Sequence, residues 1–297
     1  MSLQIFVLLT ITGLGLAGVY FLIASGLSLI FGLMDVLNLA HGVFFTAGGY
    51  ATWWVMTSFD LIGPLLPRFL IALLGGAAVG LGLGWVIERF FVRRFYGDHV
   101  TQILITLGIS LASVALIGGW FSYDPRTFPV PDVFRQVVVI GGARIPASRL
   151  IILGVSLVLL IALMAFLRRT RHGLIIRAGV ENRAMVQALG IDVARSFTLV
   201  FALGGLLAAV GGVLGAVFFA GVTPELGMNV LIFAFIVVVI GGLGSVEGTA
   251  LAAVLVGLTQ QYVNYFAGAG VGDLTVVILL AVTLLVRPQG LLGEVAR

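Results

Sequence analysis

The sequence contains no lysine and no cysteine, and charged residues make up only 9% of its 297 residues. Without lysine there is no Walker A phosphate loop, whose lysine reaches the terminal phosphates of a nucleotide, and no Schiff-base chemistry. Without cysteine there are no disulfides, thiolate metal ligands or cysteine nucleophiles. The chain therefore has neither a Walker A nucleotide site nor covalent catalysis by either residue.

Apolar residues dominate instead, at 61% of the chain, with a mean hydropathy of +1.22. Soluble domains carry about 25% charged residues, and an apolar run of about 20 residues crosses ~30 Å of hydrocarbon as a helix. We predict an all-α, polytopic integral membrane helix bundle in which residues 1–297 form a single transmembrane domain. Glycine breaks leave the count at eight or nine spans, near residues 3–25, 37–57, 66–90, 100–120, 149–167, 196–220, 229–247, 249–267 and 271–287.

Arginine indicates the orientation of the spans, because positively charged short loops stay in the cytoplasm. Segment 168–195 is rich in arginine and is predicted to be a cytoplasmic loop, and the span count places 88–99 and 287–297 on the same side. Residues 121–148 then form an external loop whose glycine pair, Gly141 and Gly142, predicts a small hairpin. The N-terminus is expected outside. The net charge of +4 reflects this topology, and we expect no nucleic-acid partner.

Small residues recur every four positions in two of the predicted spans, which lets helix backbones approach closely. We expect these stripes to be helix-packing surfaces: Gly76, Gly80 and Gly84 in one span, and Gly204, Ala208 and Gly212 in another.

Polar residues inside a membrane are costly and usually face a cavity or a protein partner. If residues 31–50 form one helix, Asp35, Asn38, Gly42 and Thr46 lie on one face with His41 beside it. This stripe predicts either the wall of a hydrated passage or a hydrogen-bonded helix interface. Alternatively, Asp35 and Asn38 lie in a short polar turn between two helices.

A second polar cluster surrounds Glu247 in the glycine-rich stretch 237–254. It is either a tight cytoplasmic turn capped by Ser245 or a helix broken within the membrane. The candidate pathway residues are thus Asp35, Asn38, His41, Gly42, Thr46 and Glu247.

Catalytic and metal-binding patterns are missing from the sequence. His41, His99 and His172 lie in separate segments, and there is no GxSxG or HExxH motif. A membrane enzyme with Asp35 and His41 as an acid–base pair is an alternative, but their spacing places them about 120° apart on a helix. The sequence favours transport over catalysis and predicts no metal site.

A short amphipathic helix is expected between Gly179 and Gly190, with the sequence "VENRAMVQAL". A compact apolar face on the cytoplasmic side is suited to a groove on a partner, or to the lipid interface.

Four motifs in this order, "FGLMDVLNLAHGVFFTAGGY", "AGVENRAMVQALGID", "GGLGSVEGTALAAVLVGL" and "RPQGLLG", resemble the permeases of branched-chain amino acid ABC importers over nearly the whole chain. The resemblance implies an inner-membrane, multi-pass subunit in contact with lipid, with no bound cofactor. It implies a second homologous permease, an extracytoplasmic substrate-binding protein, and two cytoplasmic ATPase subunits that hold ATP and magnesium. The alternatives are a related permease for urea or short amides and an ion-coupled secondary transporter.

By the same resemblance, a coupling helix and its stop contact the ATPase. Its residues are Glu181, Ala184, Met185, Ala188, Leu189, Gly190 and Ile191. The family's loop has two alanines after the acidic residue, whereas Asn182 and Arg183 follow Glu181 here.

Overall fold

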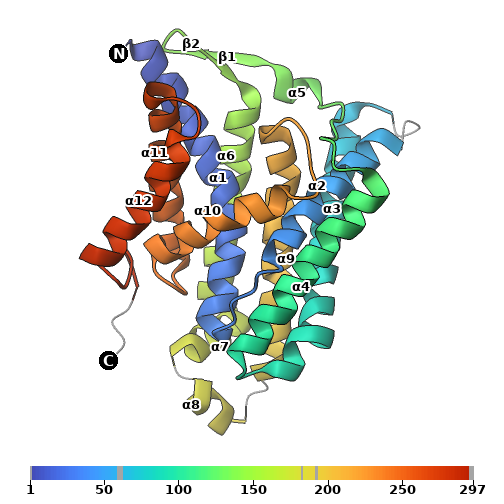
Figure 1. The fold of residues 1–297 in the computed structure, drawn as a ribbon, viewed down its shortest axis with the longest axis vertical. Helices are drawn as coiled ribbons and strands as arrows, with labels where there is room; N and C mark the ends of the chain where they lie inside the picture. The colour runs from blue at the N-terminus through green and yellow to red at the C-terminus, as the bar shows by residue number, and fades with distance from the viewer. Residues whose placement is uncertain (1, 59–62, 182, 191–192, 294–297) are drawn as a thin grey trace.

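The computed structural model describes residues 2–58, 63–181, 183–190 and 193–293. These residues form a helical bundle with one small hairpin (Figure 1). The elements are α1 (Leu3–Met34), α2 (His41–Ser58), α3 (Leu65–Val86), the π-helix η1 (Ile87–Val92), the 3₁₀ turn η2 (Arg93–Phe95), α4 (His99–Phe121), α5 (Asp132–Arg135), β1 (Val137–Ile140), β2 (Ala143–Pro146), α6 (Ala147–Arg169), α7 (Arg171–Glu181), α8 (Arg183–Ala188), α9 (Val193–Phe218), α10 (Leu226–Gly241), α11 (Val246–Ala267) and α12 (Val271–Val286).

Five of the described helices are long and apolar enough to cross a membrane, and a sixth span arises if α10 and α11 count as one. These two helices meet at a 120° bend. The helical membrane bundle is confirmed, whereas the count of eight or nine spans is not. The difference lies in α2 and α12, which have 18 and 16 residues, and in α10 and α11, which pass the test only together.

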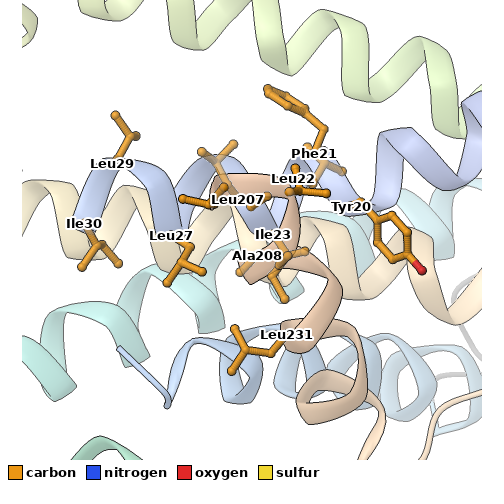
Figure 2. Close-up of a cluster of buried hydrophobic side chains, with 14 of the residues drawn as sticks. Tyr20, Phe21, Leu22, Ile23, Leu27, Leu29, Ile30, Leu207, Ala208 and Leu231 are labelled. Atoms are coloured by element: carbon orange, nitrogen blue, oxygen red, sulfur yellow. The ribbon is translucent and has the colours of Figure 1, made fainter. Parts of the chain in front are cut away.

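Helix α1 is the centre of the bundle. Its 32 residues extend about 48 Å, longer than the hydrocarbon core. Leu22, Ile23, Leu27 and Ile30 have almost no exposed surface. Figure 2 shows these side chains beside Leu207 and Ala208 of α9 and Leu231 of α10, so α1 is enclosed on several sides. A helix that is apolar all round is typical of such a buried position.

The predicted small-residue stripes lie where helix backbones come close. A Cβ atom on Gly84 of α3 would lie 2.5 Å from the carbonyl oxygen of Phe201 in α9, and one on Gly80 would collide with Gly205. Gly76 faces Val213 of α9 at a similarly short distance. Helix α3 therefore packs on α9 through its glycines, as expected where van der Waals contact drives helix association in lipid.

The second stripe, on α9, faces other helices. A Cβ atom on Gly204 would lie 3.1 Å from the carbonyl oxygen of Gly26 in α1, and Gly212 packs against Phe45 of α2. Ala208 is fully buried. The two predicted stripes thus do not pack against each other, and α9 lies between α3 on one side and α1 and α2 on the other.

The loop 121–148 carries the two-residue glycine turn. Strands β1 and β2 pair antiparallel from Val137 opposite Pro146 to Ile140 opposite Ala143. Gly141 and Gly142 have φ values of 58° and 80°, which the tight turn of such a hairpin requires. The hairpin covers the first turns of α1, where Gly142 approaches Gln4.

The bundle has two ends, which are named here by the elements that they carry. We call the one that carries the loop 121–148 and the start of α1 the hairpin end. The opposite end, with the end of α1, η1, η2, α7 and α8, is called the α8 end (Figure 1).

Candidate functional site

The chain is interrupted between Met34 and His41, so residues 31–50 do not form one continuous helix and the helical reading of this stretch does not hold. Asp35 adopts a left-handed conformation with φ of 53° and closes α1 through its N–H bond to Phe31. The polar-turn alternative describes the local structure, because aspartate tolerates this conformation better than most residues.

The segment after Asp35 runs back along α1 without regular secondary structure and ends in a turn at Leu39 and Ala40. The Leu39 N–H donates to Thr106 Oγ1 of α4 over 3.2 Å, and the Asn38 side chain accepts from the Ala40 N–H. His41 Nε2 lies 3.0 Å from the carbonyl oxygen of Ile23, about three turns before the end of α1. Helix α2 therefore begins about 16 Å inside the bundle, a distance within the maximum reach of the six linking residues.

The N-terminus of α10 meets that of α2 at this depth. A Cβ atom on Gly42 would lie 2.6 Å from the carbonyl oxygen of Gly227, so only glycine permits the contact. The Gly227 N–H donates to Thr46 Oγ1 over 3.0 Å. Each helix N-terminus carries a partial positive charge, and the two are brought together inside the bundle.

A small cavity borders this junction. Gly42, Val43 and Thr46 line it from α2, and Pro224 and Met228 line it from the start of α10. The third wall is α4, which contributes Ser110, Ser113, Val114 and Ile117. The cavity volume of ≈ 10 Å³ is room for about one water molecule, so the space is closed to any larger solute in this structure.

The wall formed by α4 was not singled out from the sequence. Gln102, Thr106 and Ser110 are buried and recur every four residues, which places them on one helix face toward α2. This spacing within an apolar span was the signal that could have identified the wall.

The six predicted pathway residues separate into three groups. Gly42 and Thr46 lie at the cavity, while Asn38 and His41 are buried in the interruption that precedes it. Asp35 and Glu247 lie instead at the α8 end. Asp35 is exposed 3.6 Å from His99, and Glu247 forms an ion pair with Arg168. Asp35 and His41 therefore do not form an acid–base pair.

The stretch around Glu247 is a sharp turn between α10 and α11. Ser245 caps α11 by accepting from the Gly248 N–H over 3.0 Å, as predicted. The "RPQGLLG" motif closes the other side: the N–H groups of Leu291 and Leu292 donate to the carbonyls of Ile240 and Gly241 at the end of α10. This role of the motif was not expected from the sequence.

The predicted coupling helix differs from expectation at its start. Gly179 lies inside α7 rather than before a helix, and α8 has only six residues. Gly190 follows α8 with φ of 77°, which suits the predicted glycine stop. Met185 and Leu189 are 62% and 69% exposed, and Ala188 is also exposed. The side chains of Glu181 and Ala184, and all of Ile191, lie outside the described residues.

No group of three or more histidine or acidic side chains that could hold a metal ion occurs in the part of the chain that the structure describes. The geometry instead has interrupted helices whose N-termini meet at a closed cavity inside a membrane bundle. This arrangement is typical of membrane transport proteins, in which such helix ends form the substrate site.

Comparison with known proteins specifies the class. Residues 9–287 match the family model described as "Branched-chain amino acid transport system / permease component", and the chain belongs to this family. It is similar to the high-affinity branched-chain amino acid transport system permease protein LivH of Escherichia coli (strain K12), at 28% identity covering 95% of this chain and 94% of LivH. It is also similar to the BraD permease protein of the corresponding Pseudomonas aeruginosa system, at 29% identity with 96% and 94% covered.

A third relative is LivM, another permease protein of the Escherichia coli (strain K12) system, at 28% identity with 92% of this chain and 68% of LivM covered. The resemblance to ABC importer permeases is thereby confirmed, and the chain is a multi-pass membrane transport subunit. The ion-coupled alternative is not favoured.

Proposed function

We propose that the chain forms part of the passage for branched-chain or other hydrophobic amino acids in an ABC importer. The observation that carries this proposal is the junction of two helix N-termini, at Gly42 and Gly227, beside a cavity with hydroxyl and apolar walls. The similarity to LivH and BraD supports the substrate class.

The two kinds of wall match the two parts of such a substrate. An amino acid carboxylate is stabilised by the partial positive charges of the α2 and α10 N-termini and by serine hydroxyls. An aliphatic side chain is suited to Val43, Val114 and Ile117. Because the cavity holds about one water molecule, transport requires α4 and the α2–α10 junction to separate.

The remaining assignments follow from the family resemblance and belong to the same proposal. The importer lies in the inner membrane. Its α8 end faces the cytoplasm, and its hairpin end faces outside. The pathway residues Asp35 and Glu247 then lie near the cytoplasmic mouth of the passage. A second, related permease completes the passage, as LivH and LivM of one transport system suggest. A binding protein delivers the substrate outside, and ATP and magnesium act on two ATPase subunits. The full complement of eight or nine spans includes the short helices.

Obstruction of the cavity tests the passage. Val114→Trp fills the space between α4 and the α2–α10 junction, so we expect uptake of labelled leucine to fall at least about tenfold in vesicles that contain the complete importer. Leu116→Trp is the matched control, because Leu116 is 64% exposed on the same helix. Its uptake should stay within about twofold of the unmodified protein. Equal uptake by both variants would exclude this cavity from the passage.

Coupling is tested separately at α8. Leu189→Glu places a charge on the exposed apolar surface that we assign to the ATPase, so uptake should fall about tenfold or more while the permease still folds. Leu174→Glu is the control, at 61% exposure on α7. ATPase co-purification and uptake are measured for both. Retention of both activities in Leu189→Glu would contradict the assignment.

A further inference from the structure

A second, larger cavity lies between α3 with η1 and the start of α9, at the α8 end. Its volume is ≈ 510 Å³, and three arginines line it: Arg89 and Arg93 from η1 and η2, and Arg195 from α9. None of the residues that line the small cavity between α2, α4 and α10 lines this second cavity. We call it the arginine groove.

The arginine groove changes from charged to apolar along the helix axis. Leu81 and Trp85 line it from α3, and Leu199 and Ala202 from α9, on the side that leads away from the α8 end into the apolar part of both helices. Leu81 lies about 12 Å along the helix from Arg89. Positive charge at the membrane boundary above an apolar wall matches the arrangement of a phospholipid, with its phosphate at the interface and its chains below.

The π-helix aligns these side chains. Leu81, Trp85, Arg89 and Arg93 are spaced by four residues, and in an α-helix each such step overshoots one turn by about 40°. The π-helix η1, over Ile87–Val92, has more residues per turn, so a four-residue step there rotates through a smaller angle and offsets this overshoot. All four side chains consequently line one cavity.

The carboxylate nearest in sequence, that of Glu88, is occupied by two hydroxyl groups. Glu88 is fully buried, and its two oxygens accept from the Tyr96 hydroxyl over 2.5 Å and from the Thr198 hydroxyl over 2.7 Å. Thr198 also lines the arginine groove, so this bond fixes η1 against α9. Neither Arg89 nor Arg93 forms an ion pair with any residue that the structure describes.

We propose that the arginine groove binds an anionic phospholipid, with the phosphate on Arg89 and Arg93 and an acyl chain along Leu81 and Trp85. Guanidinium groups bind phosphate oxygens through paired charge-assisted hydrogen bonds. Basic pockets between membrane helices on the cytoplasmic side recognise anionic head groups. The apolar wall favours a lipid over free phosphate or an acidic protein segment, since neither of these would cover Leu81 and Trp85.

Trp85 reports directly on an acyl chain in the groove. The full-length protein is placed in phosphatidylcholine bilayers that contain a small fraction of phosphatidylglycerol with brominated chains, and tryptophan quenching is measured. We expect more quenching than with the same fraction of brominated phosphatidylcholine, and we expect Trp85→Phe to abolish the excess. Equal quenching by the two lipids, or an excess that persists in Trp85→Phe, would overturn the proposal.

Affinity is measured by native mass spectrometry of the purified protein with added phosphatidylglycerol. Loss of two arginines near an anionic lipid should weaken binding about thirtyfold in Arg89→Gln/Arg93→Gln. The control Arg135→Gln/Arg144→Gln removes the same charge from exposed positions at the hairpin end and should change binding less than about twofold.

Two further outcomes identify other occupants. Displacement of the lipid by millimolar inorganic phosphate would make the groove an anion site without lipid preference. Unchanged lipid retention with loss of the ATPase subunits in Arg89→Gln/Arg93→Gln would make it a protein interface. Either result overturns the proposal.

Discussion

The hairpin end and the α8 end both carry arginine, but they use it differently. At the hairpin end, Arg68 donates to the Met56 carbonyl, Arg126 to the Phe121 carbonyl and Arg149 to the Phe218 carbonyl. These carbonyls lie in the last turns of α2, α4 and α9, where helix carbonyls lack intrahelical partners. At the α8 end, Arg169, Arg171 and Arg177 are exposed instead.

Of the three arginines in 121–148, Arg126 donates to a helix carbonyl in this way, whereas Arg135 and Arg144 are exposed. An arginine that caps a helix C-terminus is neutralised by carbonyl oxygens and the negative end of the helix dipole. Such an arginine is therefore a weaker indicator of membrane orientation than an exposed arginine. The comparison predicts that the arginines that bond helix carbonyls at the hairpin end contribute to stability, and that the exposed arginines at the α8 end contribute little.

The largest effect is expected at Arg68, which is 5% exposed. Arg68→Ala leaves the Met56 carbonyl without its donor and removes buried contacts, so the free energy of unfolding should fall by about 1–3 kcal/mol. Thermal unfolding in detergent measures the change. Arg171→Ala, at an exposed position of the α8 end, is the control and should stay within about 0.5 kcal/mol. Similar losses in the two variants would break the comparison.

A smaller effect is expected at the ion pair between Arg168 and Glu247, whose side chains are 60% and 51% exposed. Solvent screens such pairs, so Arg168→Gln should cost less than about 1 kcal/mol, and the loss should vanish in high salt. The measurement is thermal unfolding of Arg168→Gln and of the unmodified protein at low and at high ionic strength. A large loss that is independent of salt would show that the α8 end also depends on its arginines.

The smallest effect concerns Asp98, the N-cap of α4 at the α8 end. The Thr101 hydroxyl and the Thr101 backbone N–H both donate to this carboxylate, which lowers its pKa below the usual value. Since the folded pKa is the lower one, the stabilisation is present above the unfolded pKa of about 3.9 and is lost as the pH falls through the folded pKa.

Asp98→Ala should therefore lower the unfolding temperature slightly at pH 7, and the difference should shrink below about pH 4. Asp98→Asn keeps an oxygen acceptor and should lose less. Differential scanning fluorimetry across this pH range provides the measurement. If the difference in unfolding temperature between Asp98→Ala and the unmodified protein does not change with pH, the charged carboxylate of Asp98 is not what stabilises the cap.

The sequence predicted what depends on composition and local turn chemistry. Long apolar runs predicted the helical bundle, the glycine pair at 141 and 142 predicted a hairpin turn, and one of two alternatives for 237–254 was a tight turn capped by Ser245. These features follow from hydration and from backbone conformations that a few residues control.

The junction of α2 and α10 could not be predicted in the same way. Residues 31–50 are apolar enough to continue as a helix, and the interruption is stabilised by distant partners: Thr106 of α4 for Leu39, and Ile23 of α1 for His41. The contact between Gly42 and Gly227 joins positions almost two hundred residues apart. Local pattern carries no information about such partners, although the small size of both residues is a precondition for the contact.

The proposed passage through the closed cavity between α2, α4 and α10 has a consequence for the membrane when no solute is being carried. A chamber that admits about one water molecule has no room for a hydrated sodium or potassium ion. If the passage runs through this cavity, as proposed, an idle importer with this constriction does not act as a leak, and the electrical potential across the surrounding bilayer is preserved between cycles.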